Sequence, residues 1–215
     1  MTSHKNTNSK ASKFWDKASN KYSKQAISDV PSYEKKLEVS RRYLSAQSRV
    51  FEFGCGTGST ALIHAPYVEH IHAIDFSENM IDIAKSKADK EKITNVRFEK
   101  ASIDNFVAAP ESYDAVLGLS VLHLLDDREA AIAKSFELVK PGGVFITSSA
   151  CLREGYYILL WPLLWLGKLF GQVPTVKFVS VRSLVNSLVA AGFEIDYQWR
   201  PAKALWVFIV AKKNK

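Results

Sequence analysis

The sequence predicts an α/β protein, a three-layer α/β/α sandwich around a seven-stranded, mostly parallel sheet with one antiparallel strand at the C-terminus. From residue 49 onward, short apolar runs alternate with longer amphipathic stretches, which is typical of parallel strands joined by right-handed helical crossovers. A glycine-rich turn follows the first run, where open α/β sheets bind their ligands. The last two runs are joined by too few residues for a helix, so we expect them to pair antiparallel.

The residues ahead of the first strand predict a tail and two helices. Residues 1–12 are polar and rich in Lys, Ser and Asn, which predicts a disordered basic tail. Residues 13–45 carry apolar side chains at helical spacing, interrupted by Pro31. We therefore expect a single domain over residues 13–215, with these N-terminal helices covering one edge of it.

The remaining elements are predicted in order from apolar runs and from capping residues. Strands are expected at 49–53, 70–74, 95–100, 113–119, 144–148, 193–199 and 205–211. Ser77 and Asp127 are expected as N-caps of the helices that follow them. Pro66 ends the helix after the glycine-rich turn, and Gly192 ends the last helix. Residues 140–143, Lys-Pro-Gly-Gly, are expected to form a turn before the fifth strand.

Positive charge is concentrated at the N-terminus. The chain has 215 residues and a formal net charge of +7; residues 1–49 hold 11 Lys or Arg against 4 Asp or Glu, and the rest is balanced. A nucleic-acid-binding protein usually carries its basic patch on the fold itself, so we do not expect a nucleic-acid partner. We favour a solvated leader, and contact of the leader with an acidic partner or an anionic lipid surface is the alternative.

Cysteine use and the N-terminal residues indicate a compartment. Cys55 and Cys151 are too few for a disulfide scaffold or a cysteine zinc site, which favours a reducing environment. The first residues lack the apolar stretch of a secretory signal. We therefore expect a cytoplasmic protein, and this location leaves open a peripheral contact with the inner membrane surface.

The turn at residues 52–58, Glu-Phe-Gly-Cys-Gly-Thr-Gly, carries the predicted chemistry. Glycines let the backbone turn tightly and let a ligand approach closely, and the N-terminus of the next helix offers unpaired N–H groups. Asp75 ends the second strand, 23 residues after Glu52, at the separation where a carboxylate accepts hydrogen bonds from a ribose diol. These features predict a ligand that contains a nucleoside.

The spacing of the glycines separates two classes of nucleoside ligand. A dinucleotide site has the pattern G-x-G-x-x-G, whereas Gly54, Gly56 and Gly58 form G-x-G-x-G and Ser59 stands where the third glycine would be. Glu52 would repel a pyrophosphate but suits a cationic ligand. The residues therefore favour a cationic nucleoside, and an NAD(P)-dependent reductase is the weaker alternative.

Residues 52–58 resemble the first motif of the class I S-adenosylmethionine-dependent methyltransferases, (E/D)-x-G-x-G-x-G. Four further segments are similar to motifs of this family: 73–77 together with Met80, 113–117, 138–143 and Gly192-Phe193. The resemblance extends from Trp15 to the C-terminus. Within the family, the chain is similar to the small-molecule enzymes of the ubiquinone and menaquinone methyltransferase-like group. It implies the Rossmann-like fold of the family, a methyltransferase activity, and S-adenosylmethionine as cofactor with S-adenosylhomocysteine as product.

The resemblance also implies cofactor-binding residues. The amino-acid part of the cofactor would be held by the first motif: Glu52, Gly54, Cys55, Gly56 and Gly58. Asp75 would bind the ribose. The adenine would be contacted by Phe76, Met80, Ser102 and Ile103. The methionine part would be contacted by the backbone of Leu119 and Ser120. The family often has an acidic residue at the position of Ser102, and here Asp104 is the nearby carboxylate that would substitute for it.

Methyl transfer from a sulfonium is an in-line displacement that depends mainly on alignment, and it requires no metal. A base is needed only where the acceptor arrives protonated. His123, which follows the fourth strand where an acceptor pocket would open, is the candidate base, and a packing role is the alternative. Tyr22 on the leader helix is expected to close over the cofactor, as in similar family members, and a place in the core is the alternative.

An apolar insertion at about 152–178 predicts a lid over the acceptor. Residues 156–166 are apolar throughout but are shorter than the roughly 20 residues of a membrane span. Tyr156, Trp161 and Trp165 are expected to face a hydrophobic acceptor or the bilayer surface, and burial on the domain itself is the alternative.

The sequence thus predicts methyl transfer to a small, hydrophobic or lipid-like acceptor. An RNA or protein methyltransferase and a non-catalytic module that binds S-adenosylmethionine are the alternatives. No feature of the sequence specifies the oligomeric state.

Overall fold

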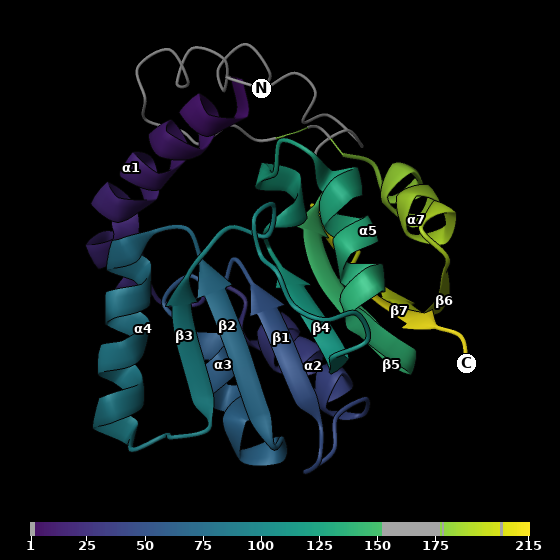
Figure 1. The fold of residues 1–215 in the computed structure, drawn as a ribbon, viewed down its shortest axis with the longest axis horizontal. Coiled ribbons are helices and arrows are strands. Elements are labelled where there is room, and N and C mark those ends of the chain that lie inside the picture. Colours follow the sequence, from purple (N-terminus) through teal and green to yellow (C-terminus); the bar gives the residue numbers. More distant parts are fainter. Residues whose placement is uncertain (1–2, 152–176, 178, 203) are drawn as a thin grey trace.

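The computed structural model describes residues 3–151, 177, 179–202 and 204–215. Within them, one seven-stranded sheet has the order β3-β2-β1-β4-β5-β7-β6 (Figure 1). Its strands are β1 Arg49–Phe53, β2 His70–Asp75, β3 Val96–Lys100, β4 Tyr113–Leu119, β5 Val139–Ala150, β6 Phe193–Trp199 and β7 Trp206–Lys213. β7 runs antiparallel to both of its neighbours, whereas the other pairs are parallel. This arrangement confirms the predicted sheet.

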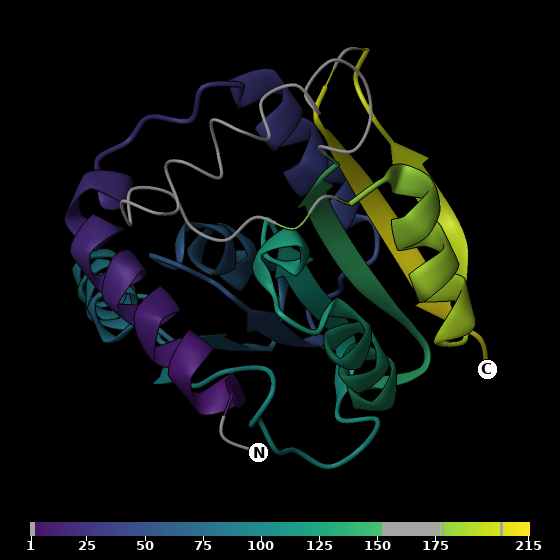
Figure 2. The ribbon, with the colours of Figure 1, turned by 90° about the horizontal axis from the view of Figure 1, so that it is seen from above.

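Helices cover both faces of the sheet (Figures 1 and 2). They are α1 Ser3–Ser23, α2 Val30–Arg41, α3 Ser59–His64, α4 Glu78–Glu91, α5 Arg128–Leu138 and α7 Val181–Ala190, with 3-10 turns at Ala65–Tyr67 and Leu122–Leu124. α2, α3 and α4 bury apolar side chains in one core, and α5 and α7 do so in a second core. The two cores, one on each side of the sheet, confirm the three-layer sandwich.

Strand β1 shows how one strand contributes to both cores. Phe51 and Phe53 lie in the core with α5, whereas Val50 lies in the core with α3, because successive side chains of a strand alternate between faces. A strand that is buried on both faces must be apolar at nearly every position. Glu52 is the one charged residue among the buried positions of β1.

Capping residues act as the sequence predicts. The Ser77 hydroxyl accepts a hydrogen bond from the backbone N–H of Met80 at the start of α4, and the Asp127 carboxylate accepts one from Ala130 at the start of α5. Gly192 follows α7 with a φ of +103°. Each of these residues satisfies or ends a helix terminus, as expected from its chemistry.

The N-terminal helices begin earlier than the sequence pattern predicts. α1 starts at Ser3, within the segment for which composition predicts a disordered tail. Residues 3–12 contain a single apolar residue, Ala11, so no apolar period is present to indicate a helix there. α2 starts at Val30 with Pro31 in its first turn and Asp29 as N-cap; Pro31 therefore begins the helix and does not interrupt it, because a first-turn residue needs no N–H.

The turn predicted at residues 140–143 is wrong, because these residues are part of β5. β5 pairs with β4 from Val139 onward, with a shift in register beside Tyr113. Such a bulge accommodates proline and glycine inside a strand. Gly143 is required there, since a Cβ atom would lie 2.6 Å from the carbonyl oxygen of Asp114.

In the described part of the chain, every helix is too short or too polar to cross a bilayer. The predicted lid residues Tyr156, Trp161 and Trp165 lie outside the described residues.

Candidate functional site

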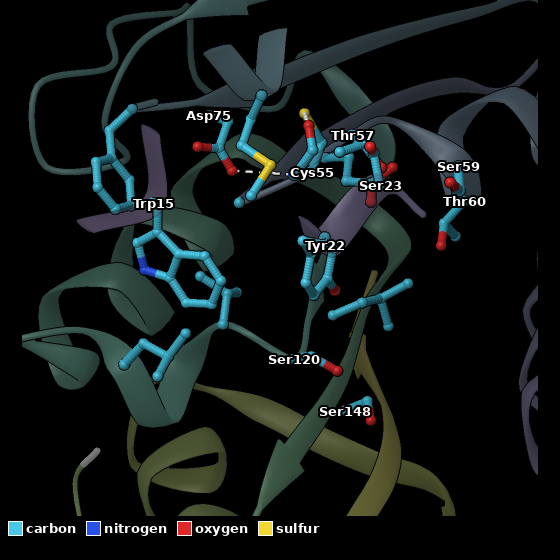
Figure 3. Close-up of a pocket in the computed structure, with 18 of the residues that line it drawn as sticks. Trp15, Tyr22, Ser23, Cys55, Thr57, Ser59, Thr60, Asp75, Ser120 and Ser148 are labelled. Carbon is cyan, nitrogen blue, oxygen red and sulfur yellow. Dashed lines mark hydrogen bonds between the residues drawn. The ribbon is translucent and has the colours of Figure 1, made fainter. Parts of the chain in front are cut away.

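A large cavity lies over the carboxyl ends of β1, β2 and β4, next to helices α1 and α2 (Figure 3). Its volume is about 1120 Å³. Residues far apart in the sequence line it, among them Trp15 and Tyr22 of α1, the glycine-rich turn, Asp75 and Ser120. This is the edge of an open parallel sheet at which ligands are bound.

The three glycines of the turn have different tasks. All have positive φ angles, of +65° at Gly54, +53° at Gly56 and +73° at Gly58. A Cβ atom would lie 2.5 Å from Val121 at Gly54 and 2.7 Å from the Phe98 ring at Gly58, so these two glycines allow close packing. At Gly56 the nearest atom would be 3.8 Å away, on Tyr22. Gly56 is therefore the position where bare backbone faces the cavity.

Asp75 at the end of β2 supports this turn. One of its carboxylate oxygens accepts a hydrogen bond from the Gly56 N–H, and the other accepts one from the Ser77 N–H, both at 2.9 Å. Burial raises the pKa of the Asp75 carboxyl, and these backbone hydrogen bonds oppose the increase. Asp75 lines the cavity, so its carboxylate lies between the glycine-rich turn and any ligand bound there.

Glu52 is the most unusual charged group of the site. Its side chain is 3% exposed, and its Oε2 atom has no hydrogen-bond partner among the described residues. Burial, with the nearby charge of Asp75, raises the pKa of Glu52 to about 8. A buried carboxyl without a partner is costly, and Glu52 lines the cavity. A cationic ligand placed beside it would supply the missing partner.

The structure brings most of the other predicted cofactor residues to the same cavity. Its lining includes Cys55, Phe76, Met80, Ser102, Leu119 and Ser120. Gly58 and Ile103 are not part of the described lining; Ile103 is buried in the core with α5. The Ser102 hydroxyl donates a hydrogen bond to the Asp104 carboxylate at 3.0 Å, and Asp104 also lines the cavity. Ser102 thus lies beside Asp104, the carboxylate expected to replace the acidic residue that the family often has at position 102.

The Cys55 thiol lies within the turn and is buried. Burial raises the pKa of Cys55 well above its ordinary value, and the negative charges of Glu52 and Asp75 raise it further. Because the thiolate is the reactive form, this environment disfavours Cys55 as a nucleophile.

The two predicted catalytic residues lie in different places. Tyr22 lines the cavity and packs edge-on against Trp15, with ring centroids 6.0 Å apart. His123 lies in the 3-10 turn after β4 and is not part of the described lining. Its Nδ1 atom accepts a hydrogen bond from the Ala150 N–H at 3.3 Å, and burial lowers the pKa of His123 to about 4.

Sequence reasoning missed Lys87 of α4. Its ammonium donates hydrogen bonds to the carbonyl oxygen of Thr57 at 3.1 Å, to the Thr57 hydroxyl at 2.9 Å and to the Ser59 hydroxyl at 3.0 Å. It thereby ties α4 to the glycine-rich turn. A signal was present: Lys87 follows Met80 and Ala84 at helical spacing, so it lies on the inward face of α4.

Sequence reasoning also missed the cavity wall that α2 provides. Tyr33 and Lys36 line this wall, together with Thr60 and His64 of α3. The Tyr33 hydroxyl lies 3.3 Å from the Thr60 hydroxyl, and burial lowers the pKa of the Lys36 ammonium. Both ring nitrogens of His64 are buried without a partner among the described residues. No motif in α2 signals this wall, since its residues reach the site only through tertiary packing.

Metal coordination needs several ligands in one place. Among the residues that the structure describes, no group of three or more His, Cys, Asp or Glu side chains is placed to hold a metal ion.

Comparison with known proteins identifies the family. Residues 50–143 match the family model of a methyltransferase domain. The chain is 33% identical over 171 residues to the demethylmenaquinone methyltransferase of Leptospira interrogans, which covers 70% of this chain and 69% of that protein. It is 29% identical over 110 residues to the uncharacterized methyltransferase YcgJ of Bacillus subtilis, covering 51% of this chain and 44% of that protein.

The fold of YcgJ is also similar. Its crystal structure superposes with a TM-score of 0.70 at 16% identity, covering 85% of this chain and 99% of that one. The matched motif region coincides with the strands and the turn that form the cavity. The chain therefore belongs to the class I S-adenosylmethionine-dependent methyltransferases.

Proposed function

We propose that this chain transfers a methyl group from S-adenosylmethionine to a small, hydrophobic or lipid-like acceptor. The observation that carries the proposal is the unpartnered, buried carboxyl of Glu52 beside the bare backbone of Gly56 in one cavity. A ligand with a positive charge close to a nucleoside fits both features. The family membership makes S-adenosylmethionine that ligand.

The residues of the cavity fit the parts of this cofactor. Glu52 would pair with its ammonium group, and Lys36 on the α2 wall has the charge to attract its carboxylate. Asp75 would accept hydrogen bonds from the ribose hydroxyls, as ribose-binding carboxylates do. Phe76 and Met80 would pack against the adenine.

When bound, the cofactor supplies a methyl group on a positively charged sulfur, which leaves as a neutral thioether. The protein's own contribution is to hold the acceptor in line with that bond and to exclude water. Trp15 and Tyr22 of α1 lie over the cavity and are suited to exclude water (Figure 3). His123 stays a prediction as the proton acceptor, needed only for an acceptor that arrives protonated. Tyr22 stays a prediction as the residue that closes over the cofactor.

Three observations support a hydrophobic acceptor. The cavity lining includes Leu124 and Leu125, and Ile27 from the segment after α1. Residues 156–166, which follow β5, are apolar throughout. The relative from Leptospira interrogans is named for demethylmenaquinone, an apolar quinone.

Calorimetric titration with S-adenosylhomocysteine tests the cofactor part of the proposal. We expect the parent chain to bind it and not NADH, and we expect Asp75→Ala to lose binding with an unchanged far-UV spectrum. Asp82→Ala, an exposed carboxylate of α4, is the matched control. Asp75→Asn replaces the alanine variant if that variant does not fold. A parent chain that ignores S-adenosylhomocysteine overturns the proposal.

Transfer of a radiolabelled methyl group tests the acceptor part. We expect label to enter a demethylated naphthoquinol and not a small polar catechol offered at the same concentration. The opposite preference would leave the methyltransferase in place but refute the hydrophobic acceptor. Label in added RNA or protein, and in neither small molecule, would support the alternatives.

A further inference from the structure

Helix α1 carries four lysines on one face: Lys13, Lys17, Lys21 and Lys24, the last just beyond its end. Steps of three and four residues bring side chains to the same side of a helix, and all four are exposed. We call these residues the lysine face. In the described part of the chain, none of the four forms an ion pair with an acidic residue.

Other residues of α1 hold the helix on the domain. Trp15 and Tyr22 line the cavity, and Asp16 accepts a hydrogen bond from the Ser77 hydroxyl of the α4 cap. Asp16 is the single acidic residue between Ser3 and Ser23, so the one acidic side chain of α1 contacts the domain and, among the described residues, does not pair with the lysines. The lysine face is left to solvent or to a partner.

Two large aliphatic side chains that come soon after α1 in the sequence are also exposed. Ile27 lies between α1 and α2, Val30 is the first residue of α2, and their exposed fractions are 48% and 47%. Ile27 lines the cavity, as do Lys13 and Lys17. Positive charge and exposed apolar surface therefore border the same mouth.

We infer that the lysine face, with Ile27 and Val30, docks the protein on an anionic lipid bilayer and holds the cavity mouth against the membrane. Lysines attract anionic headgroups, and apolar side chains beside them enter the interface, as in helices that lie on membranes. A bilayer satisfies both features, whereas a purely acidic protein surface would leave Ile27 and Val30 unpaired.

This inference rests on the proposed function, because docking brings a lipid-like acceptor to the cavity without passage through water. The balanced charge of residues 50–215 assigns the attraction to the N-terminal region. Residues 50–215 have no net charge to compete with it, so the N-terminal region would orient the protein on the membrane.

Co-sedimentation of the full chain with vesicles tests the inference. We expect binding to phosphatidylcholine vesicles that contain phosphatidylglycerol, no binding to phosphatidylcholine alone, and release at high salt. Replacing all four lysines of the lysine face by Gln should lower the partition coefficient by on the order of 100-fold or more. Ile27→Ser should weaken the binding that persists at intermediate salt.

A matched variant separates the lysine face from total charge. Replacing Lys85, Lys90, Lys92 and Lys212 by Gln removes the same charge from exposed positions elsewhere and should bind like the parent. Equal loss in both quadruple variants, binding unchanged in the first, or binding to a polyglutamate carrier but not to vesicles would each overturn the inference. Vesicle binding needs no cofactor, so this result is independent of the titration with S-adenosylhomocysteine.

Discussion

The Asp16 carboxylate of α1 accepts a hydrogen bond from the hydroxyl of Ser77, 61 residues further along the chain, at 2.6 Å. Ser77 is the N-cap of α4, and Asn79 in the same turn donates its side-chain N–H to the carbonyl oxygen of Asp16 at 3.0 Å. A carboxylate is stabilised at a helix N-terminus. Since Asp75 lies two residues before Ser77, the turn that holds α1 also forms the proposed ribose end of the cavity.

The replacement Asp16→Ala should weaken cofactor binding with little loss of fold. The docked α1 carries Trp15 and Tyr22 over the cavity, and hydrogen bonds to a charged group contribute about 1.5–3 kcal/mol. We expect the Kd for S-adenosylhomocysteine to rise about tenfold, which corresponds to about 1.4 kcal/mol, in calorimetric titration. Asn20→Ala, an exposed neighbour on α1, is the control. An unchanged Kd would show that α1 does not contribute to cofactor binding.

Binding of S-adenosylhomocysteine should release a proton from Glu52. The pKa of Glu52 is raised to about 8, so at pH 7 its carboxyl is mostly protonated before the ligand binds. An adjacent ammonium favours the charged carboxylate, which loses its proton on binding. Titration at pH 7 in two buffers with different heats of ionisation measures the released proton. Glu52→Gln should release none from this site, and equal release in both proteins would contradict the assignment.

The same carboxyl should make the unliganded protein less stable as pH rises. An acid with a folded pKa of about 8 and an unfolded pKa near 4.3 binds its proton more tightly in the folded state. As the pH rises from the unfolded pKa to the folded pKa, the contribution of Glu52 to the free energy of unfolding therefore decreases, since the folded state holds more protons than the unfolded state in this range. We expect Glu52→Gln to raise the Tm relative to the parent more at pH 8 than at pH 5. A constant difference would refute the raised pKa.

The glycine-rich turn allows a paired test of fold and binding. Gly58→Ala places a methyl group 2.7 Å from the Phe98 ring at a φ of +73°, and overpacking of this kind costs about 1–3 kcal/mol. Gly56→Ala meets no atom closer than 3.8 Å and carries only the left-handed backbone cost of about 1–2 kcal/mol. We expect the larger fall in Tm for Gly58→Ala, and loss of S-adenosylhomocysteine binding by Gly56→Ala while it remains folded.

The sequence predicts the residues of the proposed cofactor side of the cavity because local rules place them at one edge of the sheet. Glu52, Gly56 and Asp75 follow or end apolar strands, and the ends of parallel strands meet at one edge of the sheet. The connection of Asp16 to α4 has no such local rule, since it joins polar residues of two helices across 61 positions. The same is true of the α2 wall around Lys36. These features depend on how helices pack, and composition and periodicity do not specify this.

Lys87 of α4 stabilises the glycine-rich turn although it lies outside the motif at residues 52–58. Its ammonium makes three hydrogen bonds to Thr57 and Ser59, and burial lowers its pKa, so the charge is retained there at a cost. Lys87→Met keeps the length of the side chain and removes the donors. We expect a Tm lower by a few degrees, roughly 2–4 °C per kcal/mol for a chain of this size, and weaker binding of S-adenosylhomocysteine. Lys85→Met, exposed two residues earlier, should change neither quantity, and equal effects of the two variants would show that the turn holds its shape without Lys87.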